Sequence, residues 1–334
     1  MEHVLSKLGW VLAALVSLAA LAAIAGVVSA GPLDPPGPVG STDRTVITSL
    51  PYTINQSGSY VLKSSLTGVA NQNGVTVNAS NVTIDLQGFE LIGVANSLAG
   101  ISASNAFVNV SVHDGTVRGW GGAGVSLAGS GSQIKNMRVN SNGGAGISTS
   151  ADSSVLDSIA STNGGVEILV GAGSTLENCT ADGNGTAGNG IEIGTGTILR
   201  GCLARNNGGT EIYASGNFVL IEDCVVDGGT NPSPPPGGGP GDGIRINWSS
   251  VVRGCDVLSN AQSGIFVNGR SNRLENNHVN SNDGIGIYLF DFGNVGTGNS
   301  SSGNLGGACY AASGNDFVQI TGTTGATNPW SNLC

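Results

Sequence analysis

Short segments that alternate apolar and variable residues recur along most of the chain. The commonest has the form Gly-Ile-x-Ile, in which two aliphatic residues flank a variable one. Because side chains alternate across a β-strand, each copy predicts a short strand with its aliphatic pair inward and the variable residue outward. The copies begin about 19–26 residues apart, except across one proline-rich interval, at positions 74, 100, 124, 146, 165, 190, 243, 264 and 286, with a related Thr-Glu-Ile-Tyr at 210.

A second short strand follows each of these segments after roughly 8–10 residues, as in TLENCTADGN at 175–184 and ILRGCLARNN at 198–207. One such rung cannot bury its apolar face alone, whereas stacked rungs share a continuous core. Residues 73–292, divided by a period near 22, give about ten rungs without helical segments. The pattern therefore predicts an all-β protein, a right-handed parallel β-helix of about ten rungs with an N-terminal cap and a C-terminal tail.

Aligning the second strands predicts an inward column that contains four of the six cysteines. A free thiol behaves as a small buried hydrophobe, so we interpret these cysteines as core thiols. A disulfide between neighbouring rungs is the alternative in an oxidising compartment. The predicted column comprises Phe89, Thr116, Met137, Ile159, Cys179, Cys202, Cys224, Cys255 and Asn277.

The residue two positions before this column should point outward, and from Glu177 onward its charge alternates in sign between rungs. Neighbouring rungs lie about 4.8 Å apart, so opposite charges face one another. A slip by one rung would place like charges together, which makes this ladder a structural device for register. The predicted ladder comprises Lys135, Asp157, Glu177, Arg200, Glu222, Arg253 and Glu275.

The charge balance is acidic, with 12 Lys and Arg against 22 Asp and Glu and a net charge of −10. A surface of this sign repels nucleic acid and anionic membranes, so neither is an expected partner. It also offers no attraction for acidic polysaccharides unless a metal ion mediates.

The N-terminal residues have the features of a targeting segment. Lys7 precedes a nearly unbroken apolar run at 8–28, and Val28-Ser29-Ala30 supplies the small residues of a signal-peptidase site. We therefore predict a signal peptide over residues 1–30 and a secreted or extracytoplasmic location, in the periplasm or at the cell surface. An uncleaved membrane anchor formed by 8–28 is the alternative.

Proline and glycine mark the remaining boundaries. Residues 31–44 are a Pro/Gly-rich linker, and the β-helix is expected over 45–310 with a Pro-rich loop inserted at 230–242. Residues 311–334 are a C-terminal cap or tail. Cys309 and Cys334 lie outside the repeat, and we expect a disulfide between them that pins this cap.

The first rungs contain a more specific pattern, SGSYVL at 57–62 followed by DLQGF at 85–89. With the rungs that follow, residues 45–310 resemble the right-handed β-helix proteins of the pectin-lyase-like superfamily. The first rungs of those proteins commonly contain a Ser-Gly-x-Tyr-x-Leu hairpin and an Asp-Leu-x-Gly-Phe strand. The resemblance implies the fold. It leaves the activity open, because the superfamily includes pectate and alginate lyases, polygalacturonases, epimerases, tailspikes and adhesins.

The catalytic motifs of those enzymes are missing. The sequence has neither the Asp-Asp nor the Gly-His-Gly of polygalacturonase-like proteins, and Arg245-Ile246-Asn247 departs from their Arg-Ile-Lys. The Asp-Pro-His of alginate epimerase-like proteins is also absent. We therefore transfer no family's catalytic residues to this chain.

The outward position of the Gly-Ile-x-Ile strands is the strongest functional candidate, because Glu167, Glu192 and Glu211 follow one another there. Like charges about 5 Å apart repel by roughly 0.8 kcal/mol in water and 3 kcal/mol at an effective dielectric of 20. A bound cation would relieve this repulsion, so these carboxylates are a candidate Ca²⁺ site. The predicted outward row comprises Ser126, Ser148, Glu167, Glu192, Glu211, Arg245, Phe266 and Tyr288.

Neighbouring carboxylates can also form an acid–base pair, because proximity separates their pKa values. Glu192, Glu211 and Arg245 are therefore catalytic candidates, with Arg245 as a base or as the partner of a sugar carboxylate. The Pro-rich loop would form a wall of the groove. The alternative is a solvated strand face beside a variable loop. Candidates for stacking on sugar rings are Phe266, Tyr288 and Trp248.

A second candidate is the pair His113-Asp114, which is followed by Arg118 and Trp120. A His–Asp pair can serve acid–base chemistry. The alternative is structural, because Asp114-Gly115 is typical of a turn and His113 would begin the outward ladder.

Two functions follow from these candidates. The first is an exported β-helix that binds or cleaves extracellular polysaccharide along the face from Glu167 to Tyr288. If it is an enzyme, it is a polysaccharide lyase or a glycoside hydrolase. The second is a non-catalytic structural or adhesive module at the cell surface or outside the cell.

Overall fold

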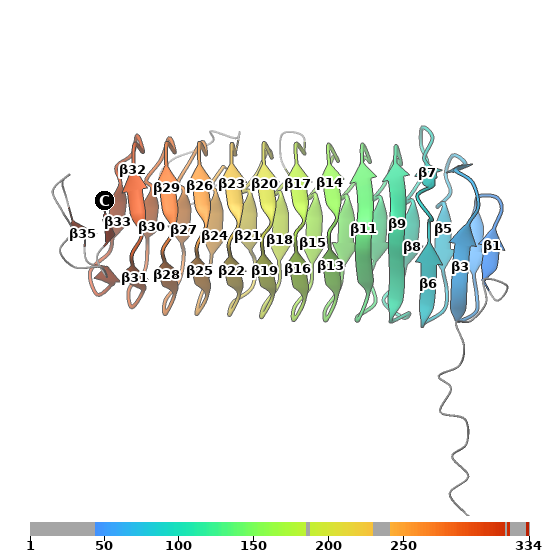
Figure 1. The fold of residues 1–334 in the computed structure, drawn as a ribbon, viewed down its shortest axis with the longest axis horizontal. Helices are drawn as coiled ribbons and strands as arrows, with labels where there is room; N and C mark the ends of the chain where they lie inside the picture. The colour runs from blue at the N-terminus through green and yellow to red at the C-terminus, as the bar shows by residue number, and fades with distance from the viewer. Residues whose placement is uncertain (1–43, 185–187, 230–240, 318, 321–331, 334) are drawn as a thin grey trace, which may run out of the picture. The chain divides into compact units, whose positions relative to one another are not determined.

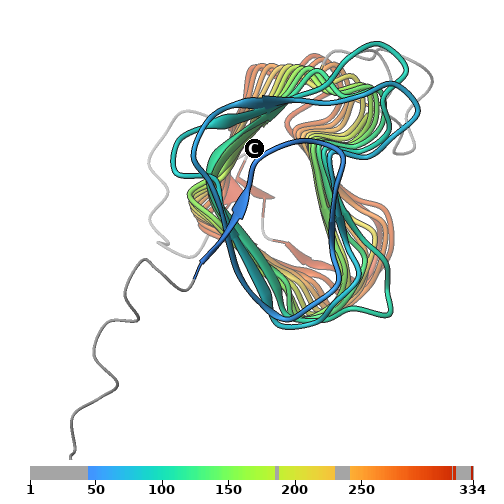
Figure 2. The same cartoon turned by 90° about the vertical axis from the view of Figure 1, so that its right-hand side faces the viewer.

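The computed structural model describes residues 44–184, 188–229, 241–317, 319–320 and 332–333. Here the chain forms short parallel strands stacked into a β-helix of about eleven turns, close to the predicted ten. Figure 1 shows the rungs side by side along the long axis, and Figure 2 shows them superimposed when viewed along that axis. The described residues contain no α-helix, and hence none long and apolar enough to cross a membrane.

Several predictions fall outside the described residues. These are the signal peptide at 1–30, nearly all of the linker at 31–44, and residues 230–240 of the Pro-rich loop. The predicted Cys309–Cys334 disulfide also stays a prediction, because Cys334 lies outside the described part of the chain.

One face of the β-helix, sheet B, is built from the Gly-Ile-x-Ile segments. Its twelve strands are paired in parallel, and in most of them two flanking aliphatic residues point into the core. The strands are β2 (Tyr52–Ile54), β5 (Val75–Val77), β8 (Ile101–Ala103), β10 (Val125–Leu127), β12 (Ile147–Thr149), β15 (Ile168–Val170), β18 (Ile191–Ile193), β21 (Ile212–Ala214), β24 (Ile244–Ile246), β27 (Ile265–Val267), β30 (Ile287–Leu289) and β33 (Cys309–Ala311).

The second strands and the first rungs form sheet A, in which most rungs contribute two short strands separated by a corner. Its strands are β1 (Thr45–Ile47), β3 (Gly58–Leu62), β4 (Leu66–Thr67), β6 (Val82–Asp85), β7 (Glu90–Ile92), β9 (Val110–Arg118), β11 (Gln133–Asn140), β13 (Ser154–Leu156), β14 (Ile159–Ser161), β16 (Thr175–Glu177), β17 (Thr180–Asp182), β19 (Ile198–Arg200), β20 (Leu203–Arg205), β22 (Leu220–Glu222), β23 (Val225–Asp227), β25 (Val251–Arg253), β26 (Asp256–Leu258), β28 (Arg273–Glu275), β29 (His278–Asn280), β31 (Val295–Thr297), β32 (Ser300–Ser302), β34 (Asp316–Phe317), β35 (Gln319–Ile320) and β36 (Asn332–Leu333).

The corner inside sheet A explains the residues found there. At this corner, one residue per rung adopts a left-handed conformation with φ between 49° and 65°, which Gly, Asn and Asp tolerate best. The chain therefore changes direction at the same point in every rung, and the side chain after the corner points inward. The corner residues are Asp114, Asn136, Asp157, Asn178, Gly201, Asp223, Gly254, Asn276 and Gly298.

The inward column is confirmed at most positions. Its four cysteines are free thiols buried in the core, and Met137 and Asn277 lie in the same column. The prediction was wrong by one residue in two rungs, because Thr116 and the exposed Ile159 pair with Arg138 on the outer face. Phe89 is only half-buried, and Leu86 packs against Gly115 in its place.

The outward charge ladder is also confirmed from Glu177 onward. Arg200 lies 3.5 Å from Glu177 and 2.9 Å from Glu222, and Arg253 reaches Glu222 at 2.7 Å. Asp157 was wrongly placed in the ladder, because it is a left-handed corner residue and Leu156 pairs with Glu177 instead.

The first rungs are filled by one large side chain. Trp120 is buried, and its indole Nε1 donates to the carbonyl oxygen of Leu91 at 3.2 Å. A Cβ atom at Gly74 would lie 2.5 Å from the carbonyl oxygen of Gly100 and 2.6 Å from the Trp120 ring. The glycine of this rung is therefore required by close packing.

Candidate functional site

The outward row of sheet B contains six of the eight residues that the sequence predicts there. Glu167 and Glu211 are absent from it, because Leu169 and Tyr213 hold those positions. The row ends with a further tyrosine in β33. In register, it comprises Ser126, Ser148, Leu169, Glu192, Tyr213, Arg245, Phe266, Tyr288 and Tyr310.

The predicted stack of three glutamates is therefore wrong. Glu167 and Glu211 occupy the position before the strand that glycine holds in other rungs. The backbone N–H groups of Ile147 and Ile191 donate to their carbonyl oxygens, just as other rungs donate to the carbonyl oxygen of that glycine. Both side chains are fully buried, whereas Glu192 faces outward. The three carboxylates share no site, so the proposed Ca²⁺ cluster does not form.

Hydrogen bonding explains why these glutamates turn inward. The backbone N–H of Asn163 donates to Glu167 Oε1 at 2.9 Å, and its side-chain amide donates to Oε2. Asn207 binds Glu211 in the same way, with its backbone N–H at 2.9 Å from Oε1. Burial raises the pKa of Glu167 to about 7 and that of Glu211 to about 8.

The predicted catalytic trio Glu192, Glu211 and Arg245 is not assembled either. Glu211 is buried, and the Tyr213 rung separates Glu192 from Arg245, so the two side chains belong to strands about 10 Å apart. The Arg245 guanidinium lies between two rings, 5.8 Å from the centroid of Tyr213 and 5.2 Å from that of Phe266. Burial raises the pKa of neighbouring Asp242 to about 7, which the positive charge of Arg245 opposes.

Aromatic side chains follow this arginine along the row. Phe266 packs edge-on against Tyr288 at 5.3 Å, and Tyr288 packs against Tyr310 at 5.0 Å. Phe290, which follows β30, lies 6.2 Å from Tyr288. Phe266 is only 1% exposed, because neighbouring side chains of the row cover it. It therefore cannot stack on a sugar as predicted.

A second group of rings lies on the turn that follows sheet B. The Arg270 guanidinium lies 3.8 Å from the centroid of the Phe292 ring and 5.8 Å from that of Trp248, and Asp291 binds it at 2.8 Å. Trp248 is 52% exposed, as its predicted role requires. We call the exposed and half-exposed rings of both groups the aromatic surface, which comprises Tyr213, Phe218, Trp248, Tyr288, Phe290, Phe292 and Tyr310.

Phe218 is the most unusual member of this surface. It has a φ of 58° and is 65% exposed, although bulky residues rarely adopt left-handed backbone conformations. Its backbone N–H donates to the carbonyl oxygen of Trp248 at 3.0 Å. A strained backbone that displays an apolar ring to solvent is typical of a binding surface.

The aromatic surface has an open hollow beyond its N-terminal end. The hollow measures about 360 Å³ and is lined by Ser148 and Leu169 of the same outward row and by Ser215 after β21.

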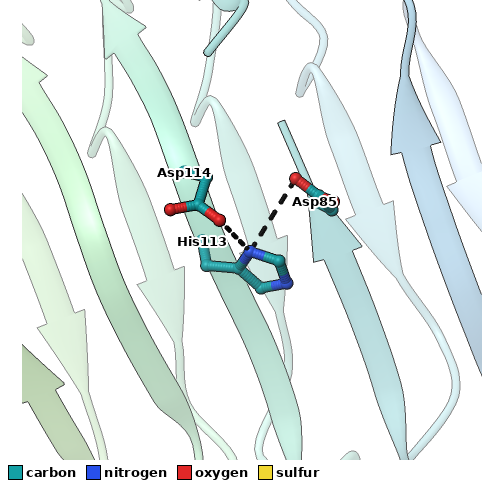
Figure 3. A group of neighbouring side chains, drawn as sticks. All are labelled: Asp85, His113 and Asp114. Carbon is teal, nitrogen blue, oxygen red and sulfur yellow. Dashed lines mark hydrogen bonds and ion pairs between the residues drawn. The ribbon is translucent and has the colours of Figure 1, made fainter. Parts of the chain in front are cut away.

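The second candidate, around His113, is brought together on sheet A (Figure 3). Asp85, His113 and Asp114 place one ligand atom each within 4.8 Å of the others. His113 Nδ1 lies 2.8 Å from Asp114 Oδ2 and 3.8 Å from Asp85 Oδ1. Arg118 and Trp120 are not part of it, because Arg118 pairs with Glu90 and Trp120 is in the core.

Each carboxylate beside His113 is held in place by a second residue. Arg44 binds Asp85 Oδ2 at 2.6 Å, and Asn136 donates to Asp114 Oδ1 at 2.6 Å. The hydrogen bonds from Asn136 and His113 lower the pKa of Asp114. As expected, His113 also stands in the outward ladder, between Asp85 and Lys135.

Comparison with protein families identifies the fold. Residues 99–246 and 188–324 match the family model described as right handed beta helix region, and together they span 226 of the 334 residues. The chain belongs to this right-handed beta helix family. The predicted handedness and the resemblance to pectin-lyase-like proteins are thereby confirmed. No curated protein matches the chain at a significant level.

Solved structures similar to this right-handed beta helix include a glucanase catalytic domain, an epimerase module and a tailspike protein. The catalytic domain of a GH87 alpha-1,3-glucanase in complex with nigerose is 15% identical, with a TM-score of 0.62 over 82% of this chain and 63% of that one. The Azotobacter vinelandii mannuronan C-5 epimerase A-module is 12% identical, with a TM-score of 0.52 over 87% and 83%. The Dettilon tailspike protein is 14% identical, with a TM-score of 0.53 over 80% and 61%. At these identities the likeness shows the fold alone.

Most of the aromatic surface of this beta helix was missed by the sequence reasoning. Tyr213 was misplaced with Glu211, and Phe218 and Phe292 lie in turns, where alternation makes no prediction. The sequence feature that could have revealed this surface was the cluster LFDFG at 289–293, which places two exposed phenylalanines directly after a strand.

Proposed function

We propose that this protein is an exported β-helix that binds extracellular polysaccharide along the aromatic surface. The observation that carries the proposal is the concentration of rings. Seven of the 16 aromatic residues lie on the outer side of sheet B or in the turns that follow its strands, in the C-terminal half of the solenoid. Scattered exposed apolar residues need no explanation, whereas a contiguous patch marks an interaction site.

The geometry of the surface favours a sugar polymer over a compact ligand. Its sheet-B members, from Tyr213 to Tyr310, occupy five successive rungs, a distance of about 19 Å at the spacing of neighbouring strands. Aromatic rings offer apolar faces of fixed orientation at low entropic cost. A linear chain lying across the strands would meet a ring or a cation of this row in four of the five rungs, at Tyr213, Arg245, Tyr288 and Tyr310.

The similar solved structures support the ligand class. The GH87 alpha-1,3-glucanase domains were solved with nigerose and with tetrasaccharides. This chain spans about 63% of the length of those domains. We propose binding without cleavage, because Glu192, Glu211 and Arg245 do not converge. An adhesive role at the cell surface is one use of such binding.

The test compares single ring deletions in a binding assay with insoluble α-1,3-glucan, alginate and pectin. Trp248→Ala and Phe292→Ala should each weaken binding to the retained polysaccharide about tenfold. Phe107→Ala is the matched control, because Phe107 is a partly exposed ring in the N-terminal rungs. If both deletions bind as well as wild type, the aromatic surface is not the binding site. Retention of wild type by none of the polysaccharides would refute the ligand class.

A further inference from the structure

A shallow hollow of about 300 Å³ opens on the outer face of sheet A, on β6, β9 and β11. Thr83, Ser111 and Gln133 line it and are paired with one another in register across three rungs. Asn81 and Asn109 also line it, and Nδ2 of Asn109 donates to Oδ1 of Asn81 at 3.0 Å. Five of its seven lining residues thus bear a hydroxyl or amide group, and Val110 and Gly131 complete the lining.

These polar groups are available to a ligand. Among the described residues, no hydrogen bond partner is found for the side chains of Thr83, Ser111 or Gln133. The same row stays polar at Ser154 and Thr175, becomes apolar at Ile198, Leu220 and Val251, and then holds Arg273. The uncharged polar side chains of this row thus lie in the rungs before Ile198.

His113 does not line this hollow but lies next to it along β9. It is two residues beyond Ser111 on the same face of β9, about 7 Å along the strand. Its Nδ1 faces Asp114 and Asp85, and because carboxylates accept hydrogen bonds, Nδ1 is the donor nitrogen and Nε2 is the ring nitrogen left for a ligand. Figure 3 shows Nε2 turned away from both carboxylates, and no described residue bonds to it.

We propose that this hollow is a binding site for a neutral sugar of mono- or disaccharide size, with His113 Nε2 hydrogen-bonded to a sugar hydroxyl. Hydroxyl groups both donate and accept, and so match the Thr, Ser, Gln and Asn side chains. Charges of both signs surround His113, with Asp85 and Asp114 beside Arg44 and Lys135, so the neighbours favour neither an anion nor a cation.

Three histidines in the chain make the site directly observable. The probes are glucose, nigerose and cellobiose, with sodium galacturonate as the charged comparison, added to the full chain. The readout is the set of histidine ring resonances in two-dimensional NMR, assigned with His113→Asn and His278→Asn. Binding of a neutral sugar should shift the His113 resonances saturably and leave those of His278, on β29, unchanged.

A matched pair of variants locates the ligand. Thr83→Val removes one hydroxyl from the hollow and should weaken binding about tenfold. Thr175→Val makes the same change in the same row, two rungs beyond Gln133, and should bind as wild type. Thermal melting of both variants confirms that they fold.

Each contrary result overturns the proposal. These are no saturable shift with any neutral sugar, equal shifts at His113 and His278, equal affinity in Thr83→Val, or a stronger response to galacturonate. Trp248→Ala separates this site from the polysaccharide surface, because that variant should keep the His113 response. Loss of polymer binding with an intact His113 response is the expected result and supports both proposals.

Discussion

Glu211 gives the sharpest prediction, because a buried carboxylate should make folding depend on pH. Its pKa is raised from 4.5 to about 8 by burial, although two donors of Asn207 favour the charged form. A raised folded-state pKa stabilises the fold fully below pH 4.5, and this contribution is lost as pH rises towards 8. At 1.36 kcal/mol per pKa unit, the loss is on the order of 3–5 kcal/mol.

The perturbation is Glu211→Gln, which removes the titration and keeps the shape. Its amide group faces the Asn207 side-chain donor, so the variant should be less stable than wild type near pH 5. The free energy of unfolding, from denaturant titrations followed by circular dichroism, should then fall much less between pH 5 and 8.5 than that of wild type. Glu192→Gln, the same change on the outer face, should keep the wild-type pH dependence.

The comparison between variants separates the contribution of Glu211 from those of Glu167 and Asp242, whose pKa values burial also raises. If Glu211→Gln and wild type lose the same free energy over this pH range, Glu211 is not a buried titrating group. In that case its inward placement at the glycine position is wrong.

Three further predictions concern the packing of the solenoid. The thiols of Cys179, Cys202, Cys224 and Cys255 should not react with Ellman's reagent in the native protein and should react after unfolding, since all four are buried; fast native reaction would contradict the column. Phe266→Ala should cost about 3–5 kcal/mol in denaturant unfolding, whereas exposed Tyr310→Ala should cost much less; equal costs would place Phe266 at the surface. Arg200→Glu should lower the melting temperature more than Arg200→Ala, and 1 M salt should narrow the difference, because Arg200 contacts Glu177 and Glu222; no difference would argue against the ladder.

The fold could be predicted well from the sequence because the same burial pattern recurs in every repeat. Each Gly-Ile-x-Ile segment buries the same two side chains, so ten approximate copies outweigh any ambiguous one. The ladder from Glu177 to Glu275 was predictable for the same reason, since opposite charges must meet in register.

The errors occurred where alternation permits two frames. In GVEILV, either Val166 and Ile168 or Ile168 and Val170 could form the inward pair, and only the second pair is used. The choice between the two frames is decided by the backbone N–H of Asn163, which needs an acceptor that Glu167 supplies from inside the rung. Periodicity contains no information about that need.

The candidate site was predicted in part for a related reason. Arg245, Tyr288 and Trp248 were found because they belong to well-formed rungs or follow them directly. The hollow beside His113 was not found, because it depends on how three neighbouring rungs place short polar side chains.

Binding of polysaccharide at the aromatic surface is tested most directly by tryptophan fluorescence. Of the tryptophans in the described residues, Trp248 is exposed and Trp120 is buried. Titration with soluble oligosaccharides of the retained polysaccharide should give a saturable change in emission in wild type and in Trp120→Phe, and none in Trp248→Phe. A change that persists in Trp248→Phe, or its absence in wild type despite retention by the polymer, would contradict binding at this surface.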